Sequence, residues 1–230
     1  MLPMEPQHAP GSRRAGRIVS TLMLAALSLA AAGAAPAPDL FDEIFARGKP
    51  IDATMKTIHA SFTETTTSPL LAKPLVAEGT LAATRPSDVE LIYTTPVRKV
   101  ITIKGGTLIV DWPGRQLHQE QDISQAQARI QKYFVTKTPE ALRKMFDVTA
   151  VEDAARPGTY RIDLVPKRKQ IEQGLTKLEL WIKKDTLMLD AMRMYFPGDS
   201  MKMMEFRDVV VNKGAGDAST PSTPRAGGAR

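Results

Sequence analysis

The residue types that carry out most enzymatic chemistry are scarce in this chain. Its 230 residues include three histidines and no cysteine, which excludes disulfides, zinc–thiolate sites, thiol nucleophiles and lipid attachment through cysteine. The sequence also contains no Gly-x-Ser-x-Gly elbow, no His-Glu-x-x-His motif, no P-loop and no glycine-rich dinucleotide fingerprint. We therefore expect a protein without enzymatic activity, without a metal site and without a cofactor.

The remaining titratable residues do not form a recognisable catalytic set. His59 is predicted on the outer face of a strand and His118 in a polar strand, and neither has a nucleophile or a metal ligand at diagnostic spacing. Asp163, Glu179 and Asp185 could act as acid and base only if the fold brought them together. Their alternation with apolar residues predicts instead that all three face solvent.

Methionine is concentrated in two adjacent predicted strands. Six of the eleven methionines lie there: Met188, Met192, Met194, Met201, Met203 and Met204. Because methionine is unbranched and polarizable, a surface lined by it adapts to guests of uncertain shape such as acyl chains. The alternative is that these side chains fill irregular gaps in the core. Strand alternation places Met192 and Met194 on the face opposite Met203, so the six cannot all line one surface.

The net charge of +6 is carried mostly by the two ends of the chain. Residues 1–34 and 212–230 each hold three basic residues and one acidic residue, so about +2 remains for the body between them. The body has no basic stretch interleaved with aromatic residues, and we expect no binding to nucleic acid. The basic run at residues 167–169 follows Pro166 and indicates a solvated turn, with contact to anionic lipid headgroups as the alternative.

The N-terminal segment has the three parts of an export signal. Three arginines between residues 13 and 17 form a basic region, residues 18–32 are apolar, and the Ala-Gly-Ala of residues 32–34 precedes the predicted cleavage after Ala34. We predict a cleaved signal at residues 1–34 rather than a spanning helix, because the apolar run is short and dominated by alanine. The paired arginines leave open whether export uses the general or the twin-arginine route.

Between the ends lies one predicted domain, residues 35–211. The tail, residues 212–230, is rich in glycine, proline, serine and threonine, and we expect it to be disordered.

Three segments of the domain have the spacing of helices. Asp39 is predicted to cap a helix from Leu40 to Arg47, which Gly48 ends, with a short turn beyond it. The Gln- and Ala-rich segment at 124–133 is predicted as a second helix, and Thr138 as the cap of a third. The apolar residues of these later segments that we expect to form a lid are Ile130, Phe134, Leu142, Met145 and Phe146.

The rest of the domain follows a period of two, which predicts about ten or eleven consecutive antiparallel strands. Tight turns separate several of them, at Gly105–Gly106, Pro113–Gly114, Pro157–Gly158 and Pro197–Gly198. A meander of this length curls on itself, so we predict an α+β fold: an unclosed antiparallel β-barrel, or half-barrel, with a helical lid. A lipid-binding cavity on its inner face would be lined by Phe62, Val89, Leu91, Tyr93, Ile101, Ile103, Leu108, Val110, Leu178, Leu180, Ile182, Met192 and Met194.

An ordered set of short motifs resembles the LolA family of periplasmic outer-membrane lipoprotein carriers. The motifs are Phe62-Thr63-Glu64-Thr65, Arg85-Pro86, Pro96, Gly105-Gly106-Thr107-Leu108 and Trp112-Pro113. Their order and spacing are similar to the family over about residues 40–120, and the later strands match in pattern only. The resemblance implies an unclosed β-barrel closed by helices, located in the periplasm.

The resemblance also implies a role for one arginine. In the family, the arginine of the Arg-Pro pair donates hydrogen bonds to backbone carbonyls of the lid, and Arg85 is the matching position. An arginine among apolar walls needs such partners for its donors. Without the resemblance, Arg85 would be interpreted as an exposed residue that enters a turn.

The functional prediction is a monomeric periplasmic carrier. It would take the acyl chains of lipoproteins or related lipids from an inner-membrane exporter and pass them to an outer-membrane acceptor. The chain departs from the family pattern at the C-terminus, where Val211 leads directly into the tail, so the cargo can be a lipoprotein or another acylated or polyene lipid. Two alternatives remain: a half-barrel module that senses lipid and regulates a membrane partner, and an accessory of an envelope glycolipid or polyene lipid exporter.

Overall fold

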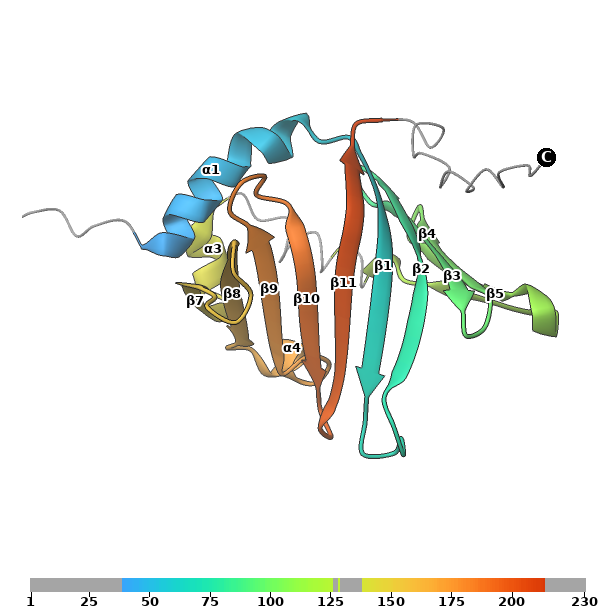
Figure 1. The fold of residues 1–230 in the computed structure, drawn as a ribbon. Helices are drawn as coiled ribbons and strands as arrows, with labels where there is room; N and C mark the ends of the chain where they lie inside the picture. Colours follow the sequence, from blue (N-terminus) through green and yellow to red (C-terminus); the bar gives the residue numbers. More distant parts are fainter. Residues whose placement is uncertain (1–38, 126–127, 129–137, 214–230) are drawn as a thin grey trace, which may run out of the picture. The chain divides into compact units, whose positions relative to one another are not determined.

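The computed structural model describes residues 39–125, 128 and 138–213, all of which belong to one compact unit, Pro38–Arg230. An eleven-stranded antiparallel sheet makes up most of this unit (Figure 1). The strands are β1 (Thr57–Thr67), β2 (Leu75–Thr84), β3 (Asp88–Thr95), β4 (Lys99–Lys104), β5 (Thr107–Trp112), β6 (Leu117–Asp122), β7 (Phe146–Glu152), β8 (Thr159–Pro166), β9 (Lys177–Lys183), β10 (Leu189–Phe196) and β11 (Ser200–Val211). The described helices are α1 (Leu40–Thr54), η1 (Pro113–Arg115), α3 (Pro139–Arg143) and α4 (Lys169–Glu172).

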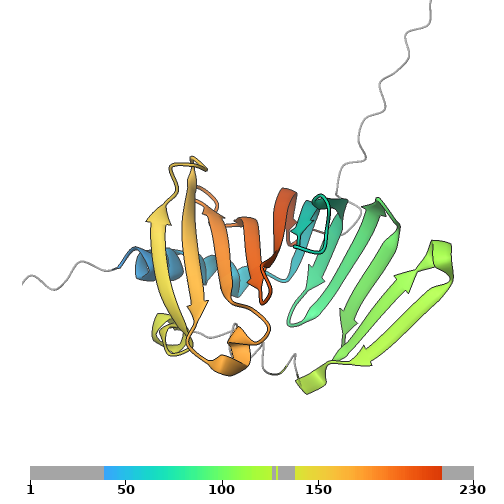
Figure 2. The same cartoon turned by 90° about the horizontal axis from the view of Figure 1, so that it is seen from below.

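Strands that are consecutive in the chain are neighbours in the sheet, except that β6 and β7 lie at its opposite edges. The order is β6-β5-β4-β3-β2-β1-β11-β10-β9-β8-β7, so the first and last strands pair at the centre (Figure 2). Because β6 and β7 do not pair with each other, the barrel is not closed. This arrangement confirms the predicted α+β half-barrel, and the eleven strands agree with the expected number.

The predicted turns join these strands where the sequence places them. Gly105 and Gly106 have φ values of 56° and 85° between β4 and β5, the left-handed region that a two-residue hairpin turn needs and that glycine adopts without strain. Gly158 and Gly198 also have positive φ values, between β7 and β8 and between β10 and β11. The glycines therefore fix where the chain reverses direction.

Helix α1 is longer than predicted. Asp39 caps it, because its carboxylate accepts a hydrogen bond from the Phe41 amide at 3.1 Å, but the helix continues through Gly48 and Pro50. Gly48 does not adopt the left-handed conformation with which glycine ends helices. The prediction that the helix ends at Arg47, with a separate turn after it, is therefore wrong.

Helix α3 is shorter than predicted. Thr138 caps it as expected, since its hydroxyl accepts a hydrogen bond from the Ala141 amide at 3.3 Å, but the helix ends before Met145. Phe146 is the first residue of β7, where it pairs with β8 and is completely buried. The predicted helical stripe through Phe146 is wrong, because strand pairing draws this residue into the sheet.

Several predictions concern residues outside the described ranges. They are the export signal at 1–34, most of the helix at 124–133 with the lid residues Ile130 and Phe134, and the tail from residue 214 onward. No helix in the described part of the chain combines the length and the hydrophobicity needed to span a membrane. Within the same residues, no three His, Cys, Asp or Glu side chains are grouped so that they could hold a metal ion.

Candidate functional site

One face of the sheet carries all of the residues predicted to line a cavity. Phe62 pairs directly with Gly79 on one side and with Phe206 on the other, and Gly79 pairs with Tyr93. Directly paired residues place their side chains on the same face, and the register extends this face, called here the inner face, across the sheet. It includes Val89, Leu91, Ile101, Ile103, Leu108 and Val110 on one half, and Leu178, Leu180, Ile182, Met192 and Met194 on the other. Their role in binding lipid stays a prediction.

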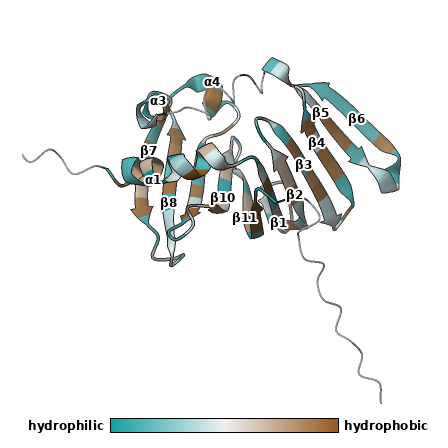
Figure 3. Cartoon of the chain, turned by 90° about the horizontal axis from the view of Figure 1, so that it is seen from above, coloured by the Kyte–Doolittle hydropathy of each residue, from teal (hydrophilic) through white to brown (hydrophobic). Residues whose placement is uncertain are grey.

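The two halves of the inner face differ in how they are covered. On the β7–β10 half, Phe41 and Ile44 of α1 are buried in one hydrophobic cluster with Leu164 and Leu178. The cluster at the centre of the sheet and on the β2–β4 strands is formed by strand residues, and no residue of a described helix contributes to it. The inner-face residues of β3, β4 and β5 other than Tyr93 are half-buried, and Figure 3 shows hydrophobic residues along these three strands.

Three of the predicted cavity residues are enclosed in the protein's own core: Leu178 in the cluster beneath α1, and Phe62 and Tyr93 at the centre of the sheet. Phe62 is 0% exposed and Tyr93 is 4% exposed, and their rings meet edge to face with centroids 5.0 Å apart. They meet across Gly79, which has no side chain to separate them. These two aromatic residues are therefore part of the core beneath the inner face. The half-buried aliphatic residues beside them are the part of the inner face that a ligand could contact.

A charged cluster interrupts the apolar inner face. Glu64 is 7% exposed; its carboxylate accepts a hydrogen bond from the Tyr93 hydroxyl at 2.7 Å and pairs with the Lys202 ammonium at 3.1 Å. The Lys99 ammonium lies 3.9 Å from the centroid of the Tyr93 ring. Sequence reasoning did not identify this cluster, although Glu64 has the same inward parity as Phe62 in a period-two strand, which was the available signal.

Burial changes the proton affinity of two groups in this cluster. Burial, and then the hydrogen bond to Glu64, raise the pKa of Tyr93 above its ordinary value, so its hydroxyl stays a neutral donor at physiological pH. Burial lowers the pKa of Lys99 below its ordinary value, against the opposing attraction of Glu64. The cluster therefore holds its charges in a partly desolvated place.

Arg85 contacts a helix, through a different partner from the one implied by the resemblance. Its guanidinium forms a two-pronged ion pair with the Asp52 carboxylate of α1, with Nη1 at 3.2 Å from Oδ2, and its backbone amide donates to the Lys56 carbonyl at 2.9 Å. No hydrogen bond from the guanidinium to a backbone carbonyl occurs among the described residues. The ion pair ties the end of α1 to the turn between β2 and β3.

The other described helix beside α1 is tied to it by a second arginine. Arg143, at the end of α3, bonds to Asp42 at 2.6 Å and to Asp39 at 2.7 Å. The hydrogen bond to Asp42 is the largest of the effects that raise the pKa of Arg143. Helices α1 and α3 are thus fixed to each other through the N-terminus of α1, where carboxylates are also favoured by the helix dipole.

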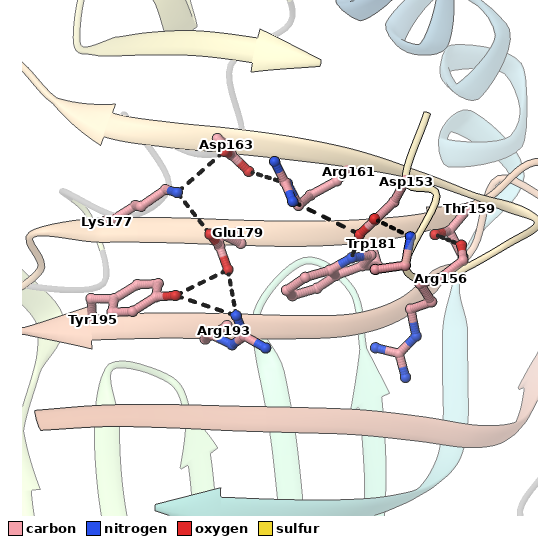
Figure 4. A network of polar contacts seen from close by, with 11 residues as sticks. Asp153, Arg156, Thr159, Arg161, Asp163, Lys177, Glu179, Trp181, Arg193 and Tyr195 are labelled. Carbon is pink, nitrogen blue, oxygen red and sulfur yellow. Dashed lines mark hydrogen bonds and ion pairs between the residues drawn. The ribbon is translucent and has the colours of Figure 1, made fainter. Parts of the chain in front are cut away.

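The opposite, outer face of β8–β10 carries a network of charged residues (Figure 4). Asp163 and Glu179 are directly paired across β8 and β9, and Lys177 bonds to both, at 3.2 Å and 2.7 Å. Arg193 pairs with Glu179 from the other side at 3.1 Å. Glu179 is only 6% exposed, so the prediction that it faces solvent is wrong: its own cationic neighbours cover it.

These outer-face carboxylates are engaged in ion pairs and do not form an acid–base couple. Asp185 is exposed, as predicted. His118 is exposed as well, with its Nδ1 atom 2.6 Å from Asp111, and His59 lies on the outer face of β1 opposite Ala82. No arrangement that resembles a catalytic site follows from these residues.

The sequence matches a known protein family. The sequence profile described as outer membrane lipoprotein carrier protein LolA matches residues 53–219, which is more than half of the chain. The chain belongs to the LolA family. The profile extends beyond the segment whose motifs carried the resemblance, since it includes the later strands. No curated protein sequence matches the chain.

Several solved structures resemble this LolA-family chain at low sequence identity. Lipoprotein LppX of Mycobacterium tuberculosis has 13% identity and a TM-score of 0.49, over 75% of this chain and 96% of that one. A LolA superfamily protein of Nitrosomonas europaea has 10% identity and a TM-score of 0.36, over 74% and 93%. MucB, in its complex with MucA from Pseudomonas aeruginosa, has 12% identity and a TM-score of 0.45, over 78% of this chain and 60% of that one.

Proposed function

We propose that this LolA-family protein is a periplasmic carrier, exported with its signal cleaved, that binds the acyl chains of lipoproteins or related lipids on the inner face. It receives them from an inner-membrane exporter and delivers them to an outer-membrane acceptor, as a monomer and without a cofactor. The observation that carries the proposal is the aliphatic surface of β3, β4 and β5, which stays half-buried with no described helix packed on it. Apolar surface of this kind in a curved sheet needs a cover or a guest.

The energetics favour an acyl chain as the guest. Burial of a methylene group contributes about 0.8 kcal/mol, so a chain of about sixteen carbons gains roughly 13 kcal/mol before the costs of ordering are subtracted. The lid proposed to open for it includes Leu142, Met145, Ile130 and Phe134. Because a ligand shifts such an equilibrium only by its differential affinity, the closed lid must be of low stability. Release then requires an apolar acceptor.

A charge placed on the inner face should abolish binding, whereas the same change on the outer face should not. Ile101 and Ile109 are both half-buried residues of neighbouring strands, but Ile101 lies on the inner face and Ile109 on the outer face. We expect Ile101→Asp to lower the affinity for a fluorescent fatty acid by at least about tenfold, because its carboxylate would lose hydration beside the chain. Ile109→Asp is the matched control and should change the affinity by less than about twofold.

Equal losses in the two variants would contradict a binding site on the inner face. Thermal melts of both proteins show whether either loss comes from unfolding.

We also propose that the ion pair of Arg85 with Asp52 acts as a latch for the lid. This gives a second prediction, in which the rate of lipid release changes without a large change in stability. Arg85→Leu removes the ion pair between Arg85 and Asp52. Because the side chain of Arg85 is 42% exposed and that of Asp52 is 63% exposed, the melting temperature should fall by less than about 3 °C. If the pair acts as this latch, by fixing α1 and, through Arg143, helix α3 that carries Leu142 of the lid, the rate of fatty-acid release should change by at least about threefold. Arg115→Leu, at an exposed arginine of η1, is the control, and unaltered release in Arg85→Leu would argue against a latch.

A further inference from the structure

The charged cluster of Glu64, Tyr93, Lys99 and Lys202 has an excess of positive charge. Glu64 is the one carboxylate of the cluster, and it is already engaged by the Tyr93 hydroxyl and by Lys202. Within the described residues, the ammonium group of Lys99 has no ion pair and no hydrogen bond; its described contact is with the face of the Tyr93 ring. Two ammonium groups thus share one carboxylate on a largely apolar face.

Two ammonium groups beside one carboxylate on a partly buried face are unfavourable unless a further anion binds there. A partly buried ammonium loses hydration, and the cost is offset only by a partner of opposite charge or by several hydrogen bonds. The face of the Tyr93 ring, whose centroid is 3.9 Å from the Lys99 ammonium, contributes about 1 to 2 kcal/mol. It does not replace the hydrogen bonds that the ammonium made to water. The lowered pKa of Lys99 is consistent with an ammonium that is not fully compensated.

The position of the cluster relative to the apolar rows suggests what the partner is. Lys99 pairs with Tyr93 at one end of β3. From this row toward the other end of β3, the inner face is aliphatic in two successive rows: Leu81, Leu91, Ile101 and Val110, then Ala83, Val89, Ile103 and Leu108. Tyr93 and Val89 are four residues apart, which spans about 14 Å of strand. A charged end joined to an apolar strip of this length matches the outline of an amphiphile.

We propose that Lys99 and Lys202 bind the anionic headgroup, a phosphate or a carboxylate, of the lipid whose acyl chain lies on the aliphatic rows. Glu64, which accepts the hydrogen bond of the Tyr93 hydroxyl, positions Lys202. The two ammonium groups donate the hydrogen bonds that the headgroup accepts. The cargo class is then an anionic amphiphile rather than an uncharged one. This inference rests on the proposed carrier function, because it assigns the second part of the same site.

Three amphiphiles with the same sixteen-carbon chain test the assignment: palmitate, lysophosphatidic acid and the uncharged monopalmitoylglycerol, each used below its micelle concentration. We expect at least one anionic amphiphile to bind the full-length protein about tenfold or more tightly than the uncharged one. The variant in which Lys99→Gln and Lys202→Gln are combined should lose this preference and keep its affinity for monopalmitoylglycerol. Lys104→Gln, at the exposed end of β4, is the control and should keep the preference.

The outcomes separate the two proposals. Equal affinities for all three amphiphiles, or a preference that persists in the double variant, would overturn the headgroup site and leave the carrier function intact. Failure of all three to bind would overturn the carrier function and this inference with it. Where the preference is present, the anionic amphiphile that binds more tightly identifies whether the cluster takes phosphate or carboxylate.

Discussion

Gly79→Ala should destabilise the domain by about 3 kcal/mol or more, which corresponds to a fall in melting temperature of roughly 10 °C. A β-carbon at this position would lie 2.2 Å from the Ile92 carbonyl oxygen and 2.8 Å from Cζ of Phe62. Neither neighbour can move easily, because the first is backbone of β3 in a place where the β2–β3 register shifts and the second is a fully buried ring. Chemical denaturation and thermal melts measure the loss.

Gly48→Ala is the matched control for this substitution. Gly48 lies inside α1 with no heavy atom within 4 Å of an added β-carbon, and alanine is favoured over glycine in helices by up to about 1 kcal/mol. This variant should therefore be as stable as the wild type or more stable. A Gly79→Ala protein with unchanged stability would contradict the close approach of β2, Phe62 and Ile92 on which the inner face is built.

Trp181→Ala should be comparably destabilising on the other half of the sheet. Trp181 is 4% exposed although it lies on the outer face, because the guanidinium groups of Arg193 and Arg156 lie 5.1 Å and 5.7 Å from its ring. Its indole nitrogen donates a hydrogen bond to Asp153 at 2.6 Å. Truncation removes a buried aromatic group and leaves its charged neighbours without a surface to pack on, so we expect a loss of about 3 to 5 kcal/mol in denaturant unfolding.

Trp112→Ala is the comparison for this prediction, since Trp112 is only half-buried at the end of β5; we expect a loss of about 1 kcal/mol there. Trp181→Phe separates the ring from its N–H group. Among the effects that lower the pKa of Asp153, the hydrogen bond from Trp181 is the largest. This bond therefore stabilises the folded protein fully at a pH above the pKa that Asp153 has in the unfolded chain. The stabilisation is lost as the pH falls through the lower pKa that Asp153 has in the folded protein. The difference in stability between wild type and Trp181→Phe should therefore narrow at acidic pH. Equal losses in the two alanine variants would contradict the packing described for Trp181.

The strands could be predicted because their signals are local. Alternation such as that of Val89, Leu91 and Tyr93 reflects a sheet with one buried face, and the glycines at 105 and 106 mark a turn that few other residues allow. The register then places all thirteen predicted inner-face residues together. The departures occur where tertiary contacts decide: α1 continues past Gly48, and Phe146 enters a strand that its helical spacing does not indicate.

The charged features were harder to predict because each depends on residues far apart in the chain. Lys202 lies beside Glu64 only because β11 pairs with β1. Asp163 lies opposite Glu179 because of the register between β8 and β9, which cannot be predicted from the sequence. Alternation predicted the face on which Glu179 lies but not its burial, because long cationic side chains from neighbouring strands cover it. Parity within a strand identifies which charges point inward, whereas pairing decides whether they are compensated.

The central claim is that the inner face accommodates an acyl chain. Mass spectrometry of organic extracts from the full-length protein, purified under native conditions, tests it most directly. We predict about one acyl lipid per protein molecule in the wild type and little in Ile101→Asp. An extract free of lipid, from a protein that also takes up no added fatty acid, would contradict the claim.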